Sequence, residues 1–484
     1  MGKAYFGLNF LKTQSRPEFC AHPKKATLLL VVLSLPIIFI SPTVAGEGNN
    51  RVSSVTRSRT YGVGSGHTSI QQTSDGGFVL ADRGFGVRVL KLDRQGETQW
   101  ERDFMPVGYV DAEADSIKQT ADRGYIVSGQ ADRYATRLDA LLLKLDRRGN
   151  VEWSKTYGGP ADDQFAVVEQ TSDRGYIAAG SSESGASQIY SWLVKLDRAG
   201  NIEWQHRYAT LGWTEAASVQ QTFDNGFIVA GKAVVSNLGT VAWVFKTDSA
   251  GNIIWQKGYG LTIDNHAYSI RQTSDGGYIV IGDVWRQGQY GVFDSSIALF
   301  LRLDALGNII WEKTYTAGNV NRPFSVGETS DQGFIISGGA SPRSDGSGIG
   351  GPWLLKLDSD GKILWQKLYG DFSDFLSSVV ETRNGGLVAA GLLSGYWIWV
   401  LRLDDNGTVN GCSMGTPSGA LLNDVRLGTT NNLTLTEVQT YQNIVATTVN
   451  VSGLTPTMQF QCASLPQAES RDGSEKLRGK TARI

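Results

Sequence analysis

The sequence predicts an all-β fold built from repeats, and three observations lead to this prediction. Two short motifs each recur seven times, at steps of 47 to 56 residues for the first motif. Ten of the 13 tryptophans fall at two fixed positions of this repeat. Glycine is abundant, at 58 of 484 residues, and the apolar runs are short and β-branched, as in strands joined by tight turns. Four strands per repeat, repeated seven times, predict a seven-bladed β-propeller.

The first motif reads Gln-Thr-x-Asp-x-Gly-aromatic and predicts a hairpin turn. Its copies begin at Gln72, Gln119, Gln170, Gln221 and Gln272, with weaker copies at Glu328 and Glu381. The aspartate is expected to cap local backbone N–H groups, and the glycine is expected to take a positive φ. The motif therefore joins the first two strands of each blade.

The second motif reads Lys/Arg-Leu-Asp-x-x-Gly-x-x-x-Trp, and its Asp-x-x-Gly part is typical of a type I turn. Its copies start at Lys91, Lys144, Lys195, Lys246, Arg302, Lys356 and Arg402. Its tryptophans are Trp100, Trp153, Trp204, Trp255, Trp311 and Trp365, and the seventh copy has Gly411 instead. Four more, Trp192, Trp243, Trp353 and Trp399, precede the Lys/Arg by three residues. We expect these rings to wedge between neighbouring blades.

The Lys/Arg residues of the second motif have two interpretations. They could form a basic ring, or they could pair inside each blade with the turn aspartates. Their regularity favours pairing, because buried charges need partners. In the fifth copy the two motifs place strands at Tyr268–Thr273, Gly277–Gly282, Ala298–Asp304 and Asn308–Tyr315.

The seventh copy lacks a convincing last strand, since Thr408-Val409-Asn410-Gly411 is short. Near the N-terminus, Arg59-Thr60-Tyr61-Gly62 matches the fourth-strand sequence Lys155-Thr156-Tyr157-Gly158. We therefore predict that a strand around Val52–Tyr61 pairs with Tyr396–Asp404. This pairing closes the ring and covers an exposed sheet edge.

The domain organisation follows from the segments around the repeats. Lys24 and Lys25 precede an apolar stretch, 26–40, and a small-residue exit, which predicts a signal peptide over 1–45. An uncleaved membrane anchor is the alternative. The propeller spans 46–411, a small β appendage spans 412–463, and a polar tail, 464–484, is expected to be disordered. Cys412 and Cys462 are expected to form a disulfide that staples the appendage to the ring, because two distant thiols are too few for a metal site.

These motifs carry a resemblance. Leu-Asp-x-x-Gly-x-x-x-Trp is similar to the tryptophan-docking motif of quinoprotein-type propellers. Thr-x-Asp-x-Gly-aromatic resembles the Asp-box turn of sialidase-like propellers. The whole unit, from about Tyr61 to Asn410, looks like the exported β-propeller repeat proteins of bacteria and archaea. The resemblance implies a fold and no particular activity, because both motifs serve structure in their own families.

Composition and motifs exclude several functions. Lys plus Arg total 45 against 47 for Asp plus Glu, so no basic excess points to nucleic acid. Ser413 lies in the one Gly-x-Ser-x-Gly, but Pro417 and Gly419 follow where a nucleophile elbow needs a helix. No catalytic residue and no metal site is predicted. No cofactor is predicted either, although Ca²⁺ and pyrroloquinoline quinone (PQQ) remain open.

Candidate ligand-binding residues lie where the repeat varies, on the face opposite the tight turns. Loop positions there often carry function on a rigid scaffold. The candidates near the loops between second and third strands and before inner strands are Trp213, Glu215, Trp285, Arg286 and Tyr290. Those on the inter-blade loops are Asp163, Asp264, His266, Arg322 and Asp374. For the acids, the alternative is that they cap the loop leading into the next inner strand.

The function we expect is that of an exported, non-catalytic binding or scaffold module, secreted, periplasmic or at the cell surface. A glycan or a protein would bind the variable-loop face, and membrane contact would require an uncleaved N-terminal segment. The alternative is a secreted propeller enzyme, either a hydrolase or lyase, or a quinoprotein-like dehydrogenase. The missing vicinal Cys pair weighs against the dehydrogenase.

Overall fold

The structure is a computed structural model that describes 57–63, 68–84, 86–133, 137–184, 188–210, 212–235, 239–260, 264–287, 293–341, 350–370, 374–393 and 397–409, together with short strands between 416 and 460. Every regular element in these residues is a β-strand. Within them, no helix is long and apolar enough to span a membrane. The predicted signal peptide, the C-terminal tail, Cys412 and Cys462 lie outside the described residues.

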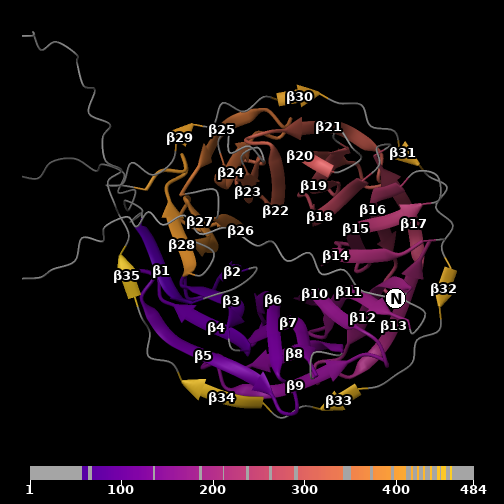
Figure 1. Cartoon of the computed structure of the whole chain (residues 1–484), viewed down its shortest axis with the longest axis vertical. Helices are drawn as coiled ribbons and strands as arrows, with labels where there is room; N and C mark the ends of the chain where they lie inside the picture. The colour runs from indigo at the N-terminus through magenta and orange to yellow at the C-terminus, as the bar shows by residue number, and fades with distance from the viewer. Residues whose placement is uncertain are drawn as a thin grey trace, which may run out of the picture. The chain divides into compact units, whose positions relative to one another are not determined.

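The strands form antiparallel meanders of four, arranged around a common centre (Figure 1). The innermost strands are β2 (Ser69–Gln72), β6 (Asp111–Gln119), β10 (Asp163–Gln170), β14 (Thr214–Gln221), β18 (Asp264–Gln272), β22 (Val320–Glu328) and β26 (Phe375–Glu381). The second strands are β3 (Phe78–Gly84), β7 (Tyr125–Asp132), β11 (Tyr176–Glu183), β15 (Phe227–Val235), β19 (Tyr278–Gln287), β23 (Phe334–Ser341) and β27 (Leu387–Leu393).

The third strands are β4 (Gly86–Leu92), β8 (Leu138–Leu145), β12 (Ile189–Leu196), β16 (Gly239–Thr247), β20 (Phe293–Leu303), β24 (Gly351–Leu357) and β28 (Trp397–Leu403). The fourth strands are β5 (Thr98–Pro106), β9 (Val151–Tyr157), β13 (Ile202–Ala209), β17 (Ile253–Tyr259), β21 (Ile309–Tyr315), β25 (Ile363–Leu368) and β1 (Arg57–Val63). The four strands predicted for the fifth copy correspond to β18–β21. A single parallel bridge, Thr240 with Asp264, joins the β14–β17 and β18–β21 meanders into one sheet.

Neighbouring meanders contact one another through their inner strands. These contacts run from β2 through β6, β10, β14, β18 and β22 to β26, and β26 contacts β2. Each apolar core cluster draws buried residues from two adjacent meanders; one, for example, joins Val89 and Phe104 to Tyr125 and Leu143. A radial arrangement of four-stranded antiparallel sheets is that of a β-propeller.

The fourth strand of the β26–β28 meander comes from the other end of the repeat region. β1 pairs antiparallel with β28, with Thr60 opposite Trp399 and Arg57 opposite Arg402. This is the pairing predicted from the match between 59–62 and 155–158. The Ser58 hydroxyl also accepts a hydrogen bond from Trp399 Nε1 at 2.9 Å, which fixes the register of the two strands.

The first motif forms the expected hairpin turn, but its glycine serves a different purpose from the one predicted. The positive φ falls on the preceding residue, for example Arg123 at 66°. At Gly124, a Cβ atom would lie 2.3 Å from Leu145 O and 2.5 Å from Lys144 Nζ. The prediction of a positive φ at this glycine is therefore wrong for the first six copies; glycine is required because the next strand approaches too closely for a side chain.

The second motif explains how one meander docks on the next. Trp255 Nε1 donates a hydrogen bond to Ala305 O at 3.2 Å, and a Cβ at Gly307 would lie 2.7 Å from the Trp255 ring. Tyr259 donates a hydrogen bond to Gly307 O at 2.7 Å. The same ring-on-glycine contact recurs for Trp100 with Gly149, Trp153 with Gly200, Trp204 with Gly251, Trp311 with Gly361, and Trp365 with Gly407.

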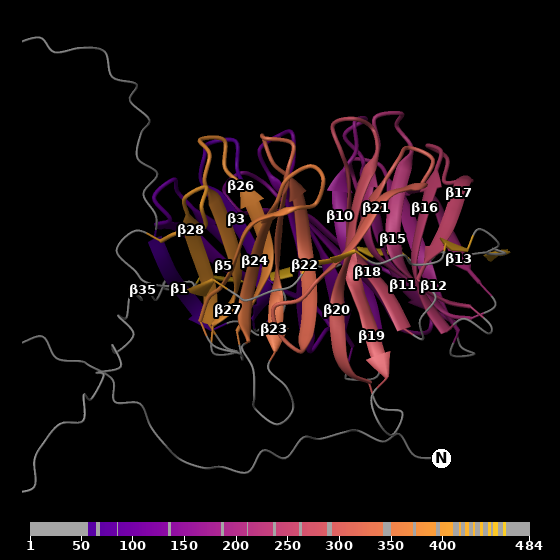
Figure 2. The same cartoon turned by 90° about the horizontal axis from the view of Figure 1, so that it is seen from above.

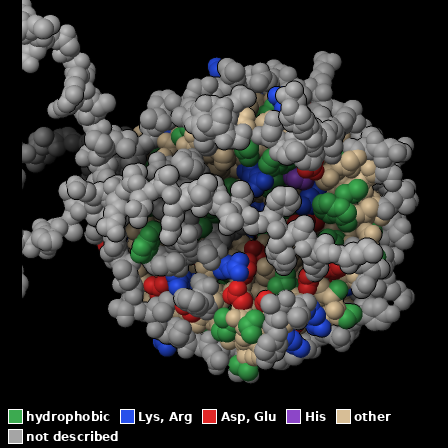
Figure 3. Space-filling model, viewed as in Figure 1, with side chains coloured by type: hydrophobic (Ala, Val, Ile, Leu, Met, Phe, Trp, Pro, Cys, Tyr) green, Lys and Arg blue, Asp and Glu red, His purple; other side chains and the backbone are tan. Residues whose placement is uncertain are grey.

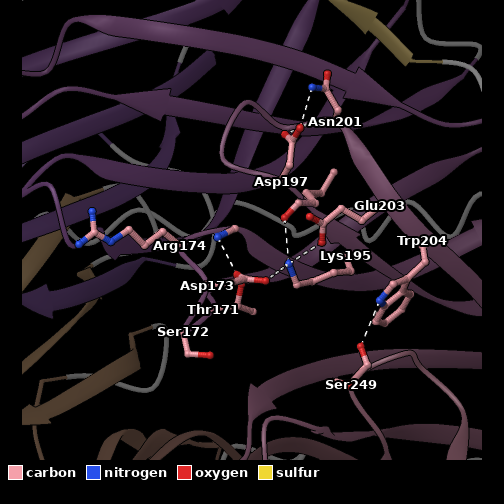
Figure 4. Close-up of polar contacts among 12 residues, drawn as sticks. Thr171, Ser172, Asp173, Arg174, Lys195, Asp197, Asn201, Glu203, Trp204 and Ser249 are labelled. Atoms are coloured by element: carbon pink, nitrogen blue, oxygen red, sulfur yellow. Dashed lines mark hydrogen bonds and ion pairs between the residues drawn. The ribbon is translucent and has the colours of Figure 1, made fainter.

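The Lys/Arg residues of the second motif pair with the turn aspartate of the same blade in the first six copies, as predicted, whereas Arg402 of the seventh donates a hydrogen bond to Arg94 O. Lys195 is buried and lies 2.8 Å from both Asp173 and Glu203 (Figure 4). Although burial opposes it, hydrogen bonds from Lys195, Thr171 and Gly175 lower the pKa of Asp173 to about 2. Equivalent pairs are Lys91 with Asp75, Lys144 with Asp122, Lys246 with Asp224, Arg302 with Asp275, and Lys356 with Asp331.

The C-terminal strands lie along the outer edges of the meanders. They are β29 (Thr416–Pro417), β30 (Leu422–Asp424), β31 (Thr429–Thr430), β32 (Thr436–Val438), β33 (Ile444–Ala446), β34 (Val449–Gly453) and β35 (Met458–Phe460). They pair antiparallel, one each, with β25, β21, β17, β13, β9, β5 and β1 in that order. These short strands thus lie around the rim (Figure 1). Within the predicted β appendage, 412–463, each described short strand thus pairs with an outer sheet edge and not with its neighbours.

Candidate functional site

The inner strands surround a cavity of ≈ 520 Å³, which we call the channel pocket. Residues from all seven inner strands, or directly before them, line it. The strands run between two faces (Figure 2), and each inner strand starts at the face predicted to carry the variable loops and ends at the first-motif turn. Much of the variable-loop face lies outside the described residues. Its centre gathers acidic, basic and apolar side chains (Figure 3).

A β-bulge in the inner strands helps to define what faces the pocket. On β6 the register shifts between Ala114 and Ser116, and on β18 it shifts between Ala267 and Ser269. The extra residue is Asp115 on β6 and Tyr268 on β18, and both line the channel pocket. A bulge re-aims a side chain out of the regular alternation, and the residue at this position differs from blade to blade.

The next column of the pocket is nearly uniform. Its members are Ser69, Ser116, Ser218, Ser269, Ser325 and Ser378. Ser69 Oγ accepts a hydrogen bond from Ile117 N at 3.2 Å, and Ser218 Oγ accepts one from Ile270 N at 3.3 Å, so these serines bridge neighbouring inner strands. The wall of the pocket thus combines hydroxyl groups and the rings of Tyr268 and Phe324 with apolar and charged side chains.

One side of the mouth holds an arginine with acidic partners. Arg83 on β3 forms an ion pair with Asp111 at 3.0 Å and a second with Glu113. Asp115 lies below them, and burial, together with the charge of Glu113, raises its pKa to about 7. Asp115 forms no hydrogen bond or ion pair with any residue in the described ranges.

The opposite side of the mouth brings predicted residues together. His266 Nε2 lies 3.0 Å from Asp264 Oδ1, and His266 Nδ1 lies 3.1 Å from Asp283 Oδ1. Tyr268 donates a hydrogen bond to Asp283 Oδ2 at 3.1 Å, and burial raises its pKa above the ordinary value. Asp283 is fully buried. This carboxylate therefore orients both the imidazole and the phenol.

The two candidate tryptophans each contact a cation; Trp285 lies in β19 and not in the loop predicted for it, and Trp213 directly precedes β14. The Arg322 guanidinium lies 5.0 Å from the centre of the Trp285 ring. Lys232 Nζ lies 4.9 Å from the centre of the Trp213 ring and 3.0 Å from Glu215 Oε2. Trp285 thus contacts Arg322 directly, and Lys232 links Trp213 to Glu215. Both tryptophans are half-buried.

Other predicted site residues are placed differently. Asp163 is buried and accepts hydrogen bonds from Gly159 N at 2.7 Å and from Ser182 Oγ, so it caps the inter-blade loop. Burial raises its pKa, which those hydrogen bonds oppose. Asp374 is buried, and a Cβ on Gly370 would come within 2.6 Å of its carboxylate. Arg286 is exposed, and Tyr290 lies outside the described residues.

Sequence reasoning missed Asp115, Lys118, Tyr268, Arg271 and Phe324, which line the pocket. A signal was available, because these residues occupy fixed positions four residues and one residue before the Gln/Glu that opens the first motif. The two positions between them carry similar residues in most copies, whereas these two positions change from copy to copy. Positions of the inner strand at which the residue type varies between copies therefore indicate the side chains that line the channel pocket.

No metal centre is formed by the described residues, since no group of three or more His, Cys, Asp or Glu side chains gathers there in a way that could hold an ion. No protein-family model and no curated protein sequence matches the chain. The arrangement can bind a polar molecule through hydroxyl, aromatic and paired charged groups.

Solved structures share a distant likeness. The chain is 13% identical to a Bacteroides caccae protein of unknown function, over 62% of this chain and 93% of that one, with a TM-score of 0.38. It is 8% identical to the C-terminal WD40 domain of Sif2, over 72% and 98%, with a TM-score of 0.41. For Sqt1 from Chaetomium thermophilum the values are 9%, 70%, 83% and 0.38. Because these TM-scores are low, the description of the fold rests on the strand pairing alone.

Proposed function

We propose that this chain is an exported, non-catalytic propeller of seven four-stranded blades that binds a polar ligand, such as a glycan, in the channel pocket and at its mouth. β1 closes the ring as the fourth strand of the last blade. The observation that carries the binding role is the chemistry of the pocket: its wall offers a column of serine hydroxyls and two aromatic rings, and the acidic groups at its mouth other than Asp115 have cationic or imidazole partners.

Ring closure is supported by a hydrogen bond that repeats around the inner strands. The side chain that ends each inner strand accepts from the backbone N–H of the preceding blade's turn. The pairs are Gln119 with Ser74, Gln170 with Ala121, Gln221 with Ser172, Gln272 with Phe223, Glu328 with Ser274, and Glu381 with Ser330. Gln72 accepts from Arg383 N at 3.1 Å, which links the last turn to the first inner strand.

The binding role is supported by how the mouth carboxylates other than Asp115 are neutralised. Glu113 pairs with Arg83, Glu215 pairs with Lys232, and both Asp264 and Asp283 contact His266. Hydrolytic and metal sites generally need carboxylates left free for chemistry. Cavities of a few hundred Å³ with few convergent polar groups suit small ligands.

A thermal-shift screen tests the binding role, with oligosaccharides, short peptides, Ca²⁺ and PQQ as separate probes. We expect an oligosaccharide to raise the melting temperature. Trp285→Ala should reduce that shift, whereas Phe223→Ala, which removes an exposed ring on the tight-turn face, should preserve it. A shift from PQQ or Ca²⁺ alone would refute the glycan-binding proposal.

Export is proposed from the basic flank, apolar stretch and small-residue exit of 24–46. We expect the mature chain, isolated from a secreting host, to begin near Gly46. Mass spectrometry of the intact protein measures this directly. A retained N-terminal segment on a membrane-associated protein would favour the anchor instead.

A secreted hydrolase or lyase is the second candidate, and Asp115 is the observation that favours it. A carboxyl group with a pKa of about 7 lies in the range of a general acid or base. If the chain is such an enzyme, turnover of a bound glycan should be lost in Asp115→Asn. Binding without turnover by the wild-type protein supports the binding module.

A further inference from the structure

Two cations line the channel pocket near its tight-turn end, and the charge of one acts on the other. Lys118 lies on β6 and Arg271 on β18, and both line the pocket. Arg271 Nη1 reaches to 3.8 Å from Glu169 Oε1 on β10 and donates to its neighbouring carbonyl, Ile270 O, at 2.9 Å. The guanidinium therefore lies toward a non-adjacent inner strand.

Lys118 has no counterion of its own. Its ammonium forms no hydrogen bond or ion pair with any residue that the structure describes. Burial lowers the pKa of Lys118 to about 8, and the charge of Arg271 acts in the same direction, opposed by Glu169. Two carboxylates, Glu328 and Glu381, also line this end of the pocket, but they accept hydrogen bonds from the tight turns at Ser274 and Ser330.

Gln71 and Gly327 lie at the same register position of their inner strands as Lys118 and Arg271, and these four residues form one layer of the pocket. Gln71 lines the pocket, and its Oε1 accepts from Gln119 N at 2.5 Å, which leaves its amide N–H groups as donors. Gly327 occupies the equivalent position on β22 and lines the pocket without a side chain. The layer is thus rich in donors, and Gly327 leaves room between them.

Asp115 does not neutralise this layer. It lies three residues before Lys118 on the same strand, at roughly 3.3 Å per residue. The charged groups that affect Asp115 are Glu113 and Arg83, at the mouth. Those that affect Lys118 are Arg271 and Glu169. Lys118 and Arg271 are therefore electrostatically separate from the acidic mouth.

We propose that Lys118 and Arg271 bind the carboxylate or sulfate group of an acidic saccharide that enters the channel pocket. This rests on the proposed binding function and deepens it. Arginine and lysine are the residues that recognise such anions. The Tyr268 and Phe324 rings and the serine column suit the faces and hydroxyls of a sugar better than those of an extended peptide.

The test compares trigalacturonate with its methyl ester, which has the same shape but no charge, by isothermal titration calorimetry. Wild-type protein should bind the acid about tenfold or more tightly than the ester, as expected for a hydrogen-bonded ion pair. Lys118→Met should abolish this preference and leave ester binding unchanged. Arg271→Met should reduce it as well. Lys257→Met, which removes a positive charge from the outer strand β17, should keep the preference.

The outcomes separate the two proposals. If the ester binds as tightly as the acid and Trp285→Ala weakens both, the anion site is wrong and the binding function stands. If triglutamate binds more tightly than trigalacturonate, the pocket takes acidic peptides and the saccharide assignment is wrong. If no probe binds the wild-type protein, both proposals fail. Melting temperatures of the variants confirm that each one is folded.

Discussion

Gly307→Ala tests how the tryptophan of one blade docks on the next. Gly307 has a φ of 73°, and an added Cβ would lie 2.7 Å from Trp255 Cζ3 and 2.8 Å from Cη2. Gly276 provides a matched control, because its φ is 86° and an added Cβ would meet nothing within 4 Å. Both glycines lie in tight turns, so the two substitutions differ mainly in the ring contact.

The expected magnitudes follow from these two environments. Alanine in the left-handed region costs about 1–2 kcal/mol, and both variants lose this amount. Forcing an extra methyl group into a packed contact costs about 1–3 kcal/mol more, and only Gly307→Ala meets that penalty. The free energy of unfolding should therefore fall by about 1–3 kcal/mol more in Gly307→Ala than in Gly276→Ala.

Urea denaturation monitored by tryptophan fluorescence measures both differences, provided that the slope of the transition is the same in the three proteins. Trp255 also reports its own environment, since a displaced ring shifts the emission. Equal destabilisation by the two substitutions would show that the ring does not hold the turn, and the role assigned to the second motif would be refuted.

Four further predictions follow from contacts described above. Tyr259→Phe should lower the free energy of unfolding by about 1–3 kcal/mol in urea denaturation, because Gly307 O loses its buried donor; an unchanged midpoint would contradict this. Removing 412–484 should uncover the outer sheet edges and cause self-association, measured by light scattering, and a stable monomer would argue against the edge-covering role. The folded-state pKa of Asp115 is raised from 3.8 to about 7, so its ionisation destabilises the fold as pH rises through that window; Asp115→Asn should gain melting temperature relative to wild type between pH 4 and pH 7.5, and a constant difference would refute this. Because the pKa of Lys118 is about 8, affinity for trigalacturonate should fall as pH rises from 7 to 9.5 in the wild-type protein but not in Lys118→Met, by calorimetry.

Much of the fold was predictable because local chemistry repeats. The aspartate turns, the docked tryptophans and the Lys–Asp pairs each depend on residues close in sequence or one repeat apart. The β1–β28 pairing was predictable as well, since 59–62 matches a fourth-strand sequence. The purpose of Gly124 was not, because a distance of 2.3 Å to the Leu145 carbonyl depends on the paired strand and not on the turn itself.

The candidate site was predictable only in part. His266, Trp285 and Arg322 were identified because they depart from the repeat, and the structure places them on one side of the mouth. Lys118 and Arg271 were missed because the channel joins strands about 150 residues apart in the chain. Asp163 caps its loop, which was the alternative stated for the acids, because a loop-capping carboxylate has the same sequence context as a ligand-binding one.

The path of 416–460 could not be predicted either. Its strands are two to five residues long, and each takes its partner from a different blade. Short alternating segments such as 433–439 and 443–451 indicate strands but carry no information about their partners. Only the exposed outer edges of the blades, formed by residues far away in sequence, determine where they pair.

Gly327→Met provides the most direct measurement of whether the channel pocket is the binding site. A Cβ at this position would meet only Ile335 Cγ2, at 3.8 Å, so a longer side chain can extend into the pocket without disturbing the strand. We predict that this variant melts at the wild-type temperature and binds trigalacturonate at least about tenfold more weakly in calorimetry. A folded Gly327→Met protein with wild-type affinity would place the ligand elsewhere and contradict the account.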